Sequence, residues 1–318
     1  MKRWLSPLVA GLCLLLLPVL PLSARTATPP APAPPVPLLW EVKGQGDARL
    51  LLLGSFHLLM PGDYPLSSDV EKAYRRAGRL VFELGPVEMG SPALAGQLMQ
   101  SALRTVGSRL QAELDGERWS RLQAWSAQRA MPLASLQGLQ TWFVALTVNL
   151  HGLAEAGMQA DLGLDRHLMQ RAVGDGKAVQ GLEAADAQFA LLKDMEAPLQ
   201  LQMLDDALED ADAGGRQLRE LHAAWRRGDA AALWQGAGES MRQQTPTLYQ
   251  RINVARNEQW LAQLPAWLQA GQGTTLMVVG APHLLGEDGL VARLQSQGLT
   301  VQRVCTVAGC PGKRTRRG

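Results

Sequence analysis

The residues best placed to do chemistry are two histidines in copies of one short motif. His57 lies in the run LLLLGSFHLL and His283 in LMVVGAPHLL, so each imidazole follows a glycine by three residues and precedes two leucines. An apolar run that ends in glycine is typical of a buried strand, and each histidine is therefore expected just beyond the end of a strand. If the fold brings the two copies together, the paired imidazoles indicate a functional site.

A carboxylate follows a third apolar run. Glu83 lies in VFELG, and a glutamate directly after buried apolar residues needs a cation or a metal nearby. Two imidazoles and one carboxylate are the ligands of many hydrolytic sites, in which a divalent ion activates water. We therefore expect His57, Glu83 and His283 to hold zinc, manganese or cobalt, which the sequence does not rank.

Arg256 is a further catalytic candidate for this site, and Glu183, Asn257, Gly54 and Gly280 are secondary candidates. Glu183 ends the run AVQGLE and repeats the geometry of the first carboxylate. Arg256 and Asn257 precede the second histidine motif on an expected helix, where the guanidinium could stabilise developing negative charge or anchor a substrate carboxylate. Gly54 and Gly280 lack a Cβ atom and so allow the backbone to turn sharply and approach a ligand.

Other polar residues are interpreted as structural. Asp165 in LGLDRHLMQRA is expected to cap a helix N-terminus. His151, His167 and His222 have polar, helical surroundings and are expected at the surface. The tryptophans recur at helical spacing and are assigned to the core.

The elements that must position these residues are predicted by apolar periodicity. Strands are expected at 39–42, 49–53 and 79–84 with a helix at 68–77, and at 275–279 and 300–305 with a helix at 288–297. Between about 92 and 233 the spacing is helical, interrupted by one strand at 178–182. The predicted fold class is α+β, with an α/β-like central mixed sheet formed by N- and C-terminal strand-helix units around a largely helical middle. Ligands of such sheets bind beyond the carboxyl ends of the strands.

The two ends of the chain carry different signals. Residues 1–24 have the basic, apolar and small-residue order of a signal peptide, which predicts export to the periplasm or outside the cell. Residues 25–37 form a proline- and alanine-rich linker, 38–308 the catalytic domain, and 309–318 a basic, disordered tail. The apolar run is too short and too rich in proline to predict a stable membrane span. Whether the signal is cleaved or kept as an anchor stays open.

Charge and cysteine use narrow the class of partner. The chain has 31 basic and 29 acidic side chains, and no basic surface predicts nucleic-acid binding. A peptide or small-molecule substrate is expected, and the oligomeric state stays open. In an oxidising compartment Cys305 and Cys310 are expected to form a disulfide, because as metal ligands they would lack histidine neighbours.

Taken in order along the chain, these motifs resemble the TraB/GumN family, which includes the animal TIKI proteins and is related in fold to erythromycin esterases and ChaN-like proteins. The resemblance covers nearly the whole chain after the signal. It rests on GSFH, FELG, GLDRHLMQRAVGDGKAVQGLE with Gln188 soon after, WRRGDAAAL, ARNEQW and GAPHLLGEDGLVARLQSQG. The ending VQRVCTVAGC departs from the family pattern.

The resemblance implies a metal-dependent site of His57, Glu83 and His283, with Arg256 as a nearby functional group. It also implies peptide-bond hydrolysis, because TIKI members are described as metalloproteases that require manganese or cobalt. The main hypothesis is therefore an exported metal-dependent hydrolase that acts on amide bonds. One alternative is a metal-independent, esterase-like hydrolase in which an imidazole and Glu83 act as general bases. The other is a non-catalytic module that binds a peptide, haem or a metal.

Overall fold

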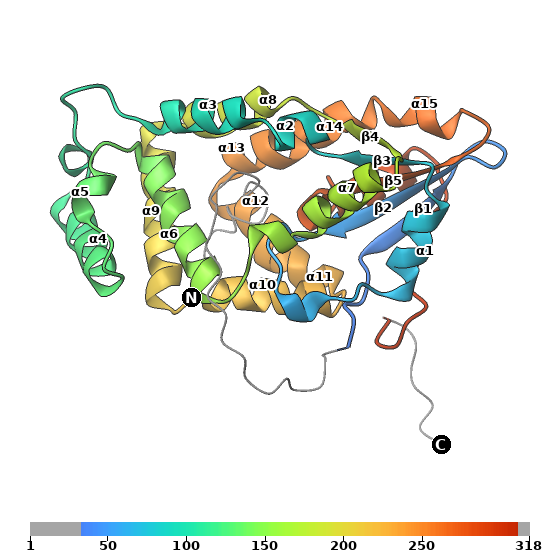
Figure 1. The fold of residues 1–318 in the computed structure, drawn as a ribbon, viewed down its shortest axis with the longest axis horizontal. Helices are drawn as coiled ribbons and strands as arrows, with labels where there is room; N and C mark the ends of the chain where they lie inside the picture. The colour runs from blue at the N-terminus through green and yellow to red at the C-terminus, as the bar shows by residue number, and fades with distance from the viewer. Residues whose placement is uncertain (1–32, 311–318) are drawn as a thin grey trace, which may run out of the picture.

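A single mixed sheet organises the molecule, whose computed structural model describes residues 33–310. The strand order is β4-β3-β5-β2-β1-β6, so β5, from the C-terminal part of the chain, lies between the N-terminal strands β3 and β2 (Figure 1). The strands are β1 (Leu39–Lys43), β2 (Arg49–Ser55), β3 (Arg79–Phe82), β4 (Ala178–Gly181), β5 (Thr274–Gly280) and β6 (Val301–Arg303). The predicted α+β class and mixed sheet are confirmed.

The four strands that carry the candidate residues are parallel. β5 pairs with β2 on one side and with β3 on the other, and β4 extends the parallel part beyond β3. β5 is buried along nearly its whole length, as expected of a central strand. Because parallel strands end at one edge, the residues that follow β2, β3, β4 and β5 are brought together there.

The remaining strands close the other side of the sheet. β1 runs antiparallel to β2, and β6 runs antiparallel to β1. β6 is shorter than the expected strand at 300–305, because it pairs only with three residues of β1, Trp40 to Val42. β3 likewise ends at Phe82, which leaves Glu83 just outside the strand.

Helices follow the strands and then form most of the middle of the chain. α1 (Ser68–Arg76) is capped by Ser67, whose hydroxyl accepts a hydrogen bond from the backbone N–H of Val70. α6 (Thr141–Glu155) and α9 (Ala197–Asp212) lie side by side beyond the sheet, with α4 (Gly116–Gln128) outside them (Figure 1). α7 (Leu164–Gly174) leads into β4. The helical middle is therefore present, with β4 as the predicted interruption.

The other helices are mostly short. They are α2 (Pro86–Met89), α3 (Pro92–Ala102), α5 (Leu133–Leu136), α8 (Ala185–Lys193), α10 (Arg216–Arg226), α11 (Ala230–Leu233), α12 (Ser240–Gln244), α13 (Pro246–Tyr249), α14 (Ala255–Leu261), α15 (Leu264–Leu268) and α16 (Leu290–Ser296). Two 3-10 turns matter for the site, η1 (Pro61–Asp63) and η6 (Ala281–Leu284). None of the helices within residues 33–310 combines the length and the hydropathy needed to cross a bilayer.

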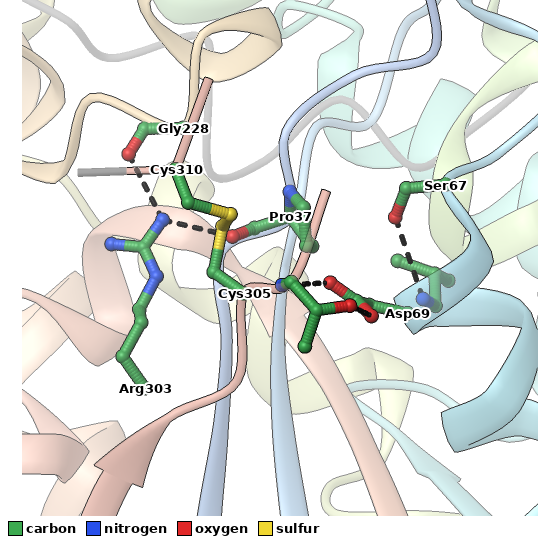
Figure 2. Close-up of a disulfide and its surroundings, with 9 residues drawn as sticks. Pro37, Ser67, Asp69, Gly228, Arg303, Cys305 and Cys310 are labelled. Atoms are coloured by element: carbon green, nitrogen blue, oxygen red, sulfur yellow. Dashed lines mark hydrogen bonds between the residues drawn. A yellow bond between two sulfur atoms is a disulfide. The ribbon is translucent and has the colours of Figure 1, made fainter. Parts of the chain in front are cut away.

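The two ends of the described chain are tied to the body. The backbone N–H of Val36 donates to the carbonyl of Arg226, 2.8 Å away. After β6, a disulfide joins Cys305 to Cys310, and the Thr306 N–H and hydroxyl donate to Asp69 of α1 (Figure 2). The preferred disulfide is thus present. The predicted signal peptide at 1–24, most of the linker, and residues 311–318 of the predicted tail lie outside the described residues.

Candidate functional site

The carboxyl edge of the parallel strands brings His57, Glu83 and His283 into one buried cluster. β2 and β5 end level with each other, with Ser55 paired to Gly280, so the two histidine motifs begin within one residue of the same depth. His57 Nε2 lies 4.0 Å from Glu83 Oε1. The three residues are only 4%, 3% and 2% exposed. Sequence copies separated by more than two hundred residues therefore form one site.

Glu83 is fixed through both of its oxygens. The backbone N–H of Gly280 donates to Oε1 at 2.7 Å, and Arg256 Nη2 donates to Oε2 at 2.5 Å. Burial alone would raise the pKa of this carboxyl, but the charge of Arg256 and the imidazoles of His283 and His57 outweigh it and lower the pKa to about 2. Glu83 is therefore an ionised carboxylate at neutral pH.

The two candidate glycines have different surroundings. A Cβ atom at Gly280 would lie 3.3 Å from His57 Nε2 and 3.4 Å from Glu83 Oε1, so this glycine lets the backbone approach the reactive atoms. A Cβ atom at Gly54 would instead lie 3.2 Å from the Cβ atoms of Leu38 and Ala281. Gly54 thus permits close packing behind the site and does not border the three central side chains.

Arg256 is the hub of the cluster. Its Nε donates to both oxygens of Glu183 at 3.0 and 3.1 Å, while its Nη2 also bonds Glu83. Its Nη1 lies 3.1 Å from His283 Nε2, and its guanidinium carbon lies 4.8 Å from the centre of the Trp260 ring. Burial alone would lower the pKa of Arg256, but the carboxylates of Glu83 and Glu183 raise it above its ordinary value. Arg256 and Glu183 therefore belong to the site.

His283 is held in one neutral tautomer. Arg256 donates to its Nε2, so the imidazole proton lies on Nδ1 and is donated to Asn257 Oδ1, 2.9 Å away. Asn257 is itself fixed, because its Nδ2 donates to Asn253 Oδ1 and to the carbonyls of His283 and Asp288. Burial and the charge of Arg256 lower the pKa of His283 to about 3. Asn257 is thus a positioning residue.

The structure corrects the interpretation of Asp165. The N-cap of α7 is Gly163 and not Asp165, whose Oδ1 lies 3.0 Å from His57 Nδ1. A Cβ atom at Gly163 would overlap the carbonyl of His57, so this glycine allows the start of α7 to approach the backbone of His57. An acidic residue in the first turn of a helix resembles an ordinary cap, and sequence reasoning therefore missed its partner.

Asp165 also sets the protonation of His57. Burial alone would lower the pKa of this imidazole, but the charge and the hydrogen bond of Asp165, together with the charge of Glu83, raise it to about 9. Since Nδ1 donates to Asp165, Nε2 is the nitrogen that can exchange a proton with a substrate. This Nε2 is buried and has no hydrogen-bond partner within residues 33–310.

His222 does not lie where it was expected, and Gln188 supports the site although no role was assigned to it. His222 was expected at the surface but is buried, with its Nε2 2.8 Å from Asp63 Oδ2 and its ring 5.8 Å from that of Phe56. The buried face of α10 explains this, because His222 shares it with Leu218, Leu221 and Trp225. Gln188, on α8, donates to Glu183 Oε1 at 2.7 Å and so supports the carboxylate that holds Arg256.

The expected metal ligands do not form an open ligand set in this arrangement. Arg256 lies against both His283 Nε2 and Glu83 Oε2, so two of the three expected donors already accept hydrogen bonds from a cation. Among residues 33–310, no group of three His, Cys, Asp or Glu side chains has a geometry that could hold an ion. His57 Nε2 and Glu83 Oε1 converge, but a third ligand would require Arg256 to withdraw. The donor set as it stands therefore does not fit the implied ion.

Comparison with known proteins identifies the family. Residues 38–303 match the TraB/PrgY/gumN family, and the chain belongs to it. The chain is also similar to the uncharacterized protein YbaP of Escherichia coli K12, with 25% identity over 251 residues that cover 79% of this chain and 89% of YbaP. The YbaP of Shigella flexneri is similar at the same identity and coverage. No solved structure matches.

Proposed function

We propose that this protein is an exported hydrolase that cleaves an acyl bond, of a peptide or another amide, with a water activated by His57. The observation that carries the proposal is the Asp165–His57 pair at the carboxyl edge of the sheet, whose free Nε2 faces Glu83. An aspartate that holds the far nitrogen of an imidazole is the arrangement that makes histidine an oriented general base.

The distances suit one water molecule. A water oxygen about 2.8 Å from each of two atoms can bond both when these lie 4.0 Å apart, as His57 Nε2 and Glu83 Oε1 do. His57 Nε2 takes a proton from this water as its oxygen bonds to the acyl carbon, and the carbonyl electrons move onto oxygen. When the carbonyl re-forms, the leaving group departs with the proton from Nε2. Asp165 and Glu83 stabilise the imidazolium formed between these steps.

The raised pKa of His57 gives this mechanism a pH signature. With a pKa of about 9 the imidazole is protonated at neutral pH, and a general base must first lose that proton. We therefore expect kcat/KM to rise with pH and to level off above about 9. A profile that is flat from pH 6 to 9 would contradict a general base with this pKa.

Arg256 supplies the positive charge of the site. Its guanidinium is held by Glu83 and Glu183, so its position is fixed before any substrate binds. A fixed cation close to the reacting carbonyl stabilises the negative charge that develops on oxygen. Since His57, Glu83 and His283 are all nearly fully buried, substrate reaches the cluster only when the segments covering it move.

The decisive experiment measures hydrolysis of a panel of peptides, amides and esters by the purified protein after metal has been removed and its absence checked by elemental analysis. His57→Gln should abolish turnover, and His167→Gln should not, because His167 is half-buried on α7 and contacts Tyr64 instead of the cluster. Saturable binding of substrates without conversion, with or without added metal, would favour the non-catalytic alternative.

A metal-dependent hydrolase is the second candidate, and one observation favours it. The buried Nε2 of His57 lacks a partner and faces a carboxylate, as two ligands of one ion would. Titration of the apoprotein with manganese, cobalt or zinc, followed by calorimetry, tests it. Stoichiometric binding that His283→Gln removes, with activity that depends on the ion, would replace the metal-independent proposal.

A further inference from the structure

A polar cavity lies away from the cluster at the sheet edge. It has a volume of about 90 Å³ and is formed where α9 turns into α10 beside α6 (Figure 1). Its polar lining comes from Arg129, Asn149, Glu155, Asp210 and Arg219. None of these residues contacts the His57 and Arg256 cluster, so the cavity needs an explanation of its own.

Two of the lining side chains are largely buried and keep hydrogen-bonding capacity that the described chain does not use. Asn149 is 8% exposed, and its amide makes no hydrogen bond to any of the residues at 33–310. Asp210 is 7% exposed, and its Oδ1 accepts one hydrogen bond, from the backbone N–H of Gln217 at 3.1 Å. Neither side chain has an atom that is both wholly buried and unpaired, so their free polar atoms are reached from the cavity. Largely buried amides and carboxylates nearly always find a partner in protein, water or ligand. These two groups therefore point to a polar ligand.

The charges on the walls of the cavity are of opposite sign. Burial raises the pKa of Asp210, although the backbone N–H of Gln217 and the nearby charge of Arg219 act to lower it. Arg219, on the other wall, donates from Nη1 to the carbonyl of Gly214 and forms no ion pair with the rest of the described chain. Arg129 and Glu155 are already paired with each other, Nη2 to Oε2 at 3.1 Å. The groups left for a ligand are thus one carboxylate, one guanidinium and one amide.

We propose that this cavity binds a small zwitterion of the α-amino acid class, with its ammonium at Asp210 and Asn149 and its carboxylate at Arg219. An ammonium donates three hydrogen bonds, which a carboxylate and an amide oxygen accept, and a guanidinium pairs with a carboxylate. The size agrees, since a water needs roughly 10–15 Å³ of such space, and the cavity therefore holds about six to nine heavy atoms. The proposal does not rest on the hydrolytic function.

The test is calorimetric titration of the purified full-length protein with glycine, L-alanine and L-serine. Ethylamine and acetate, which carry one charge each, are the matched controls. Asp210→Asn keeps the acceptor for Gln217 and removes the charge, so it should weaken binding by about tenfold or more, as should Arg219→Gln. Glu209→Gln on α9 and Arg216→Gln on α10 change exposed charges outside the cavity and should leave the affinity unchanged.

The titration distinguishes results that support the site from results that overturn it. Saturable binding of the zwitterions, with both single-charge controls at least about tenfold weaker, supports the site. No binding of any zwitterion up to about 10 mM, or an affinity that Asp210→Asn and Arg219→Gln leave unchanged, overturns it. If Asp210→Asn fails to unfold cooperatively, Asn149→Leu and Arg219→Gln decide, because Arg219→Gln gives up only the hydrogen bond to the carbonyl of Gly214.

Discussion

At the scale of single residues, the site is a set of charges that hold one another in place. Arg256 lies between Glu83 and Glu183, and His57 lies between Asp165 and Glu83. Each buried charge thus has an opposite charge within hydrogen-bond or ion-pair distance. Removing one member leaves another buried and unpaired, which costs more than the pair contributes.

Replacing Asp165 by Asn should test how Asp165 orients and charges His57 without disrupting the fold. The amide keeps the shape of the carboxylate but removes the charge, so the pKa of His57 should fall from about 9 towards its ordinary value. We expect turnover to drop by about 10²- to 10⁴-fold, as when the aspartate of a catalytic triad is changed to asparagine. NMR titration of the His57 ring and the pH dependence of kcat/KM measure both effects.

The control for this change is Asp161→Asn, since Asp161 pairs at the surface with Arg166. It should alter neither the titration nor turnover. An unchanged pKa of His57 in the Asp165 variant would show that the raised value has another cause.

Glu83→Gln should lower the stability of the fold in a way that depends on pH. Breaking a buried pair typically costs about 3–5 kcal/mol. Because folding lowers the pKa of Glu83 to about 2, its stabilising contribution is complete above about pH 5 and is lost as the pH falls towards 2. Urea denaturation at several pH values should therefore show the difference between wild type and variant shrinking in acid. A constant difference would contradict the lowered pKa.

At the scale of elements, the ends of the strands determine which atoms meet. Gly280 ends β5, and its backbone N–H contacts Glu83 while its missing side chain leaves room for His57 Nε2. The same residue thus ends the strand, binds the carboxylate and keeps the space beside the imidazole open. A methyl group there would have to displace at least one of the two side chains.

Gly280→Ala should reduce activity far more than stability. The added Cβ would lie 3.3 Å from His57 Nε2, a contact that the imidazole can relieve only by moving a few tenths of an ångström. A displacement of that size in a site that depends on orientation should reduce kcat at least about tenfold. Gly174→Ala on α7 is the matched control, because its Cβ would meet nothing within 4 Å. Equal activity of both variants would show that the space beside Gly280 has no role.

The strands and their partners could be predicted from sequence to different degrees. Long apolar runs identified β2 and β5, and their shared motif indicated that His57 and His283 act together. The partnership of Asp165 with His57 depends on how α7 crosses the sheet, which no local pattern encodes. A signal for His222 did exist, since its spacing from Leu218, Leu221 and Trp225 places it on the apolar face of α10.

At the scale of the whole molecule, the sheet joins the two ends of the chain. β5, from the C-terminal part, lies between β2 and β3, so the N-terminal strands on either side of it do not pair with each other. The cluster at the sheet edge likewise needs Arg256 and His283 from the last quarter of the chain. Neither the fold nor the site is therefore complete before β5 is in place.

A chain that ends at residue 270 should consequently not fold, although it contains most of the helices. It lacks the central strand, which would leave the apolar faces of β2 and β3 exposed to water. Loss of near-UV circular dichroism and of a cooperative urea transition would show this. The control is a chain that ends at Cys310, which retains every described element and should unfold cooperatively. A native-like spectrum from the shorter chain would contradict the central role of β5.

The disulfide follows the edge strand β6 and should add a modest amount of stability. Cys305 and Cys310 enclose a short loop that docks on Asp69 of α1 (Figure 2). For a loop of this size the chain-entropy estimate is about 2 kcal/mol. Cys305→Ser together with Cys310→Ser should lower the unfolding free energy by about that amount and remove any effect of reductant on the melting temperature.

The two edge strands of the sheet are short, although β3 beside β4 also has 4 residues. β4 has 4 residues and β6 has 3, whereas β2 and β5 between them have 7 each. A short border offers a neighbouring molecule few free backbone groups with which to extend the sheet, and natural proteins use this to avoid amyloid-like stacking. Concentrated solutions of the folded protein should accordingly resist fibril formation for as long as the central strands stay covered.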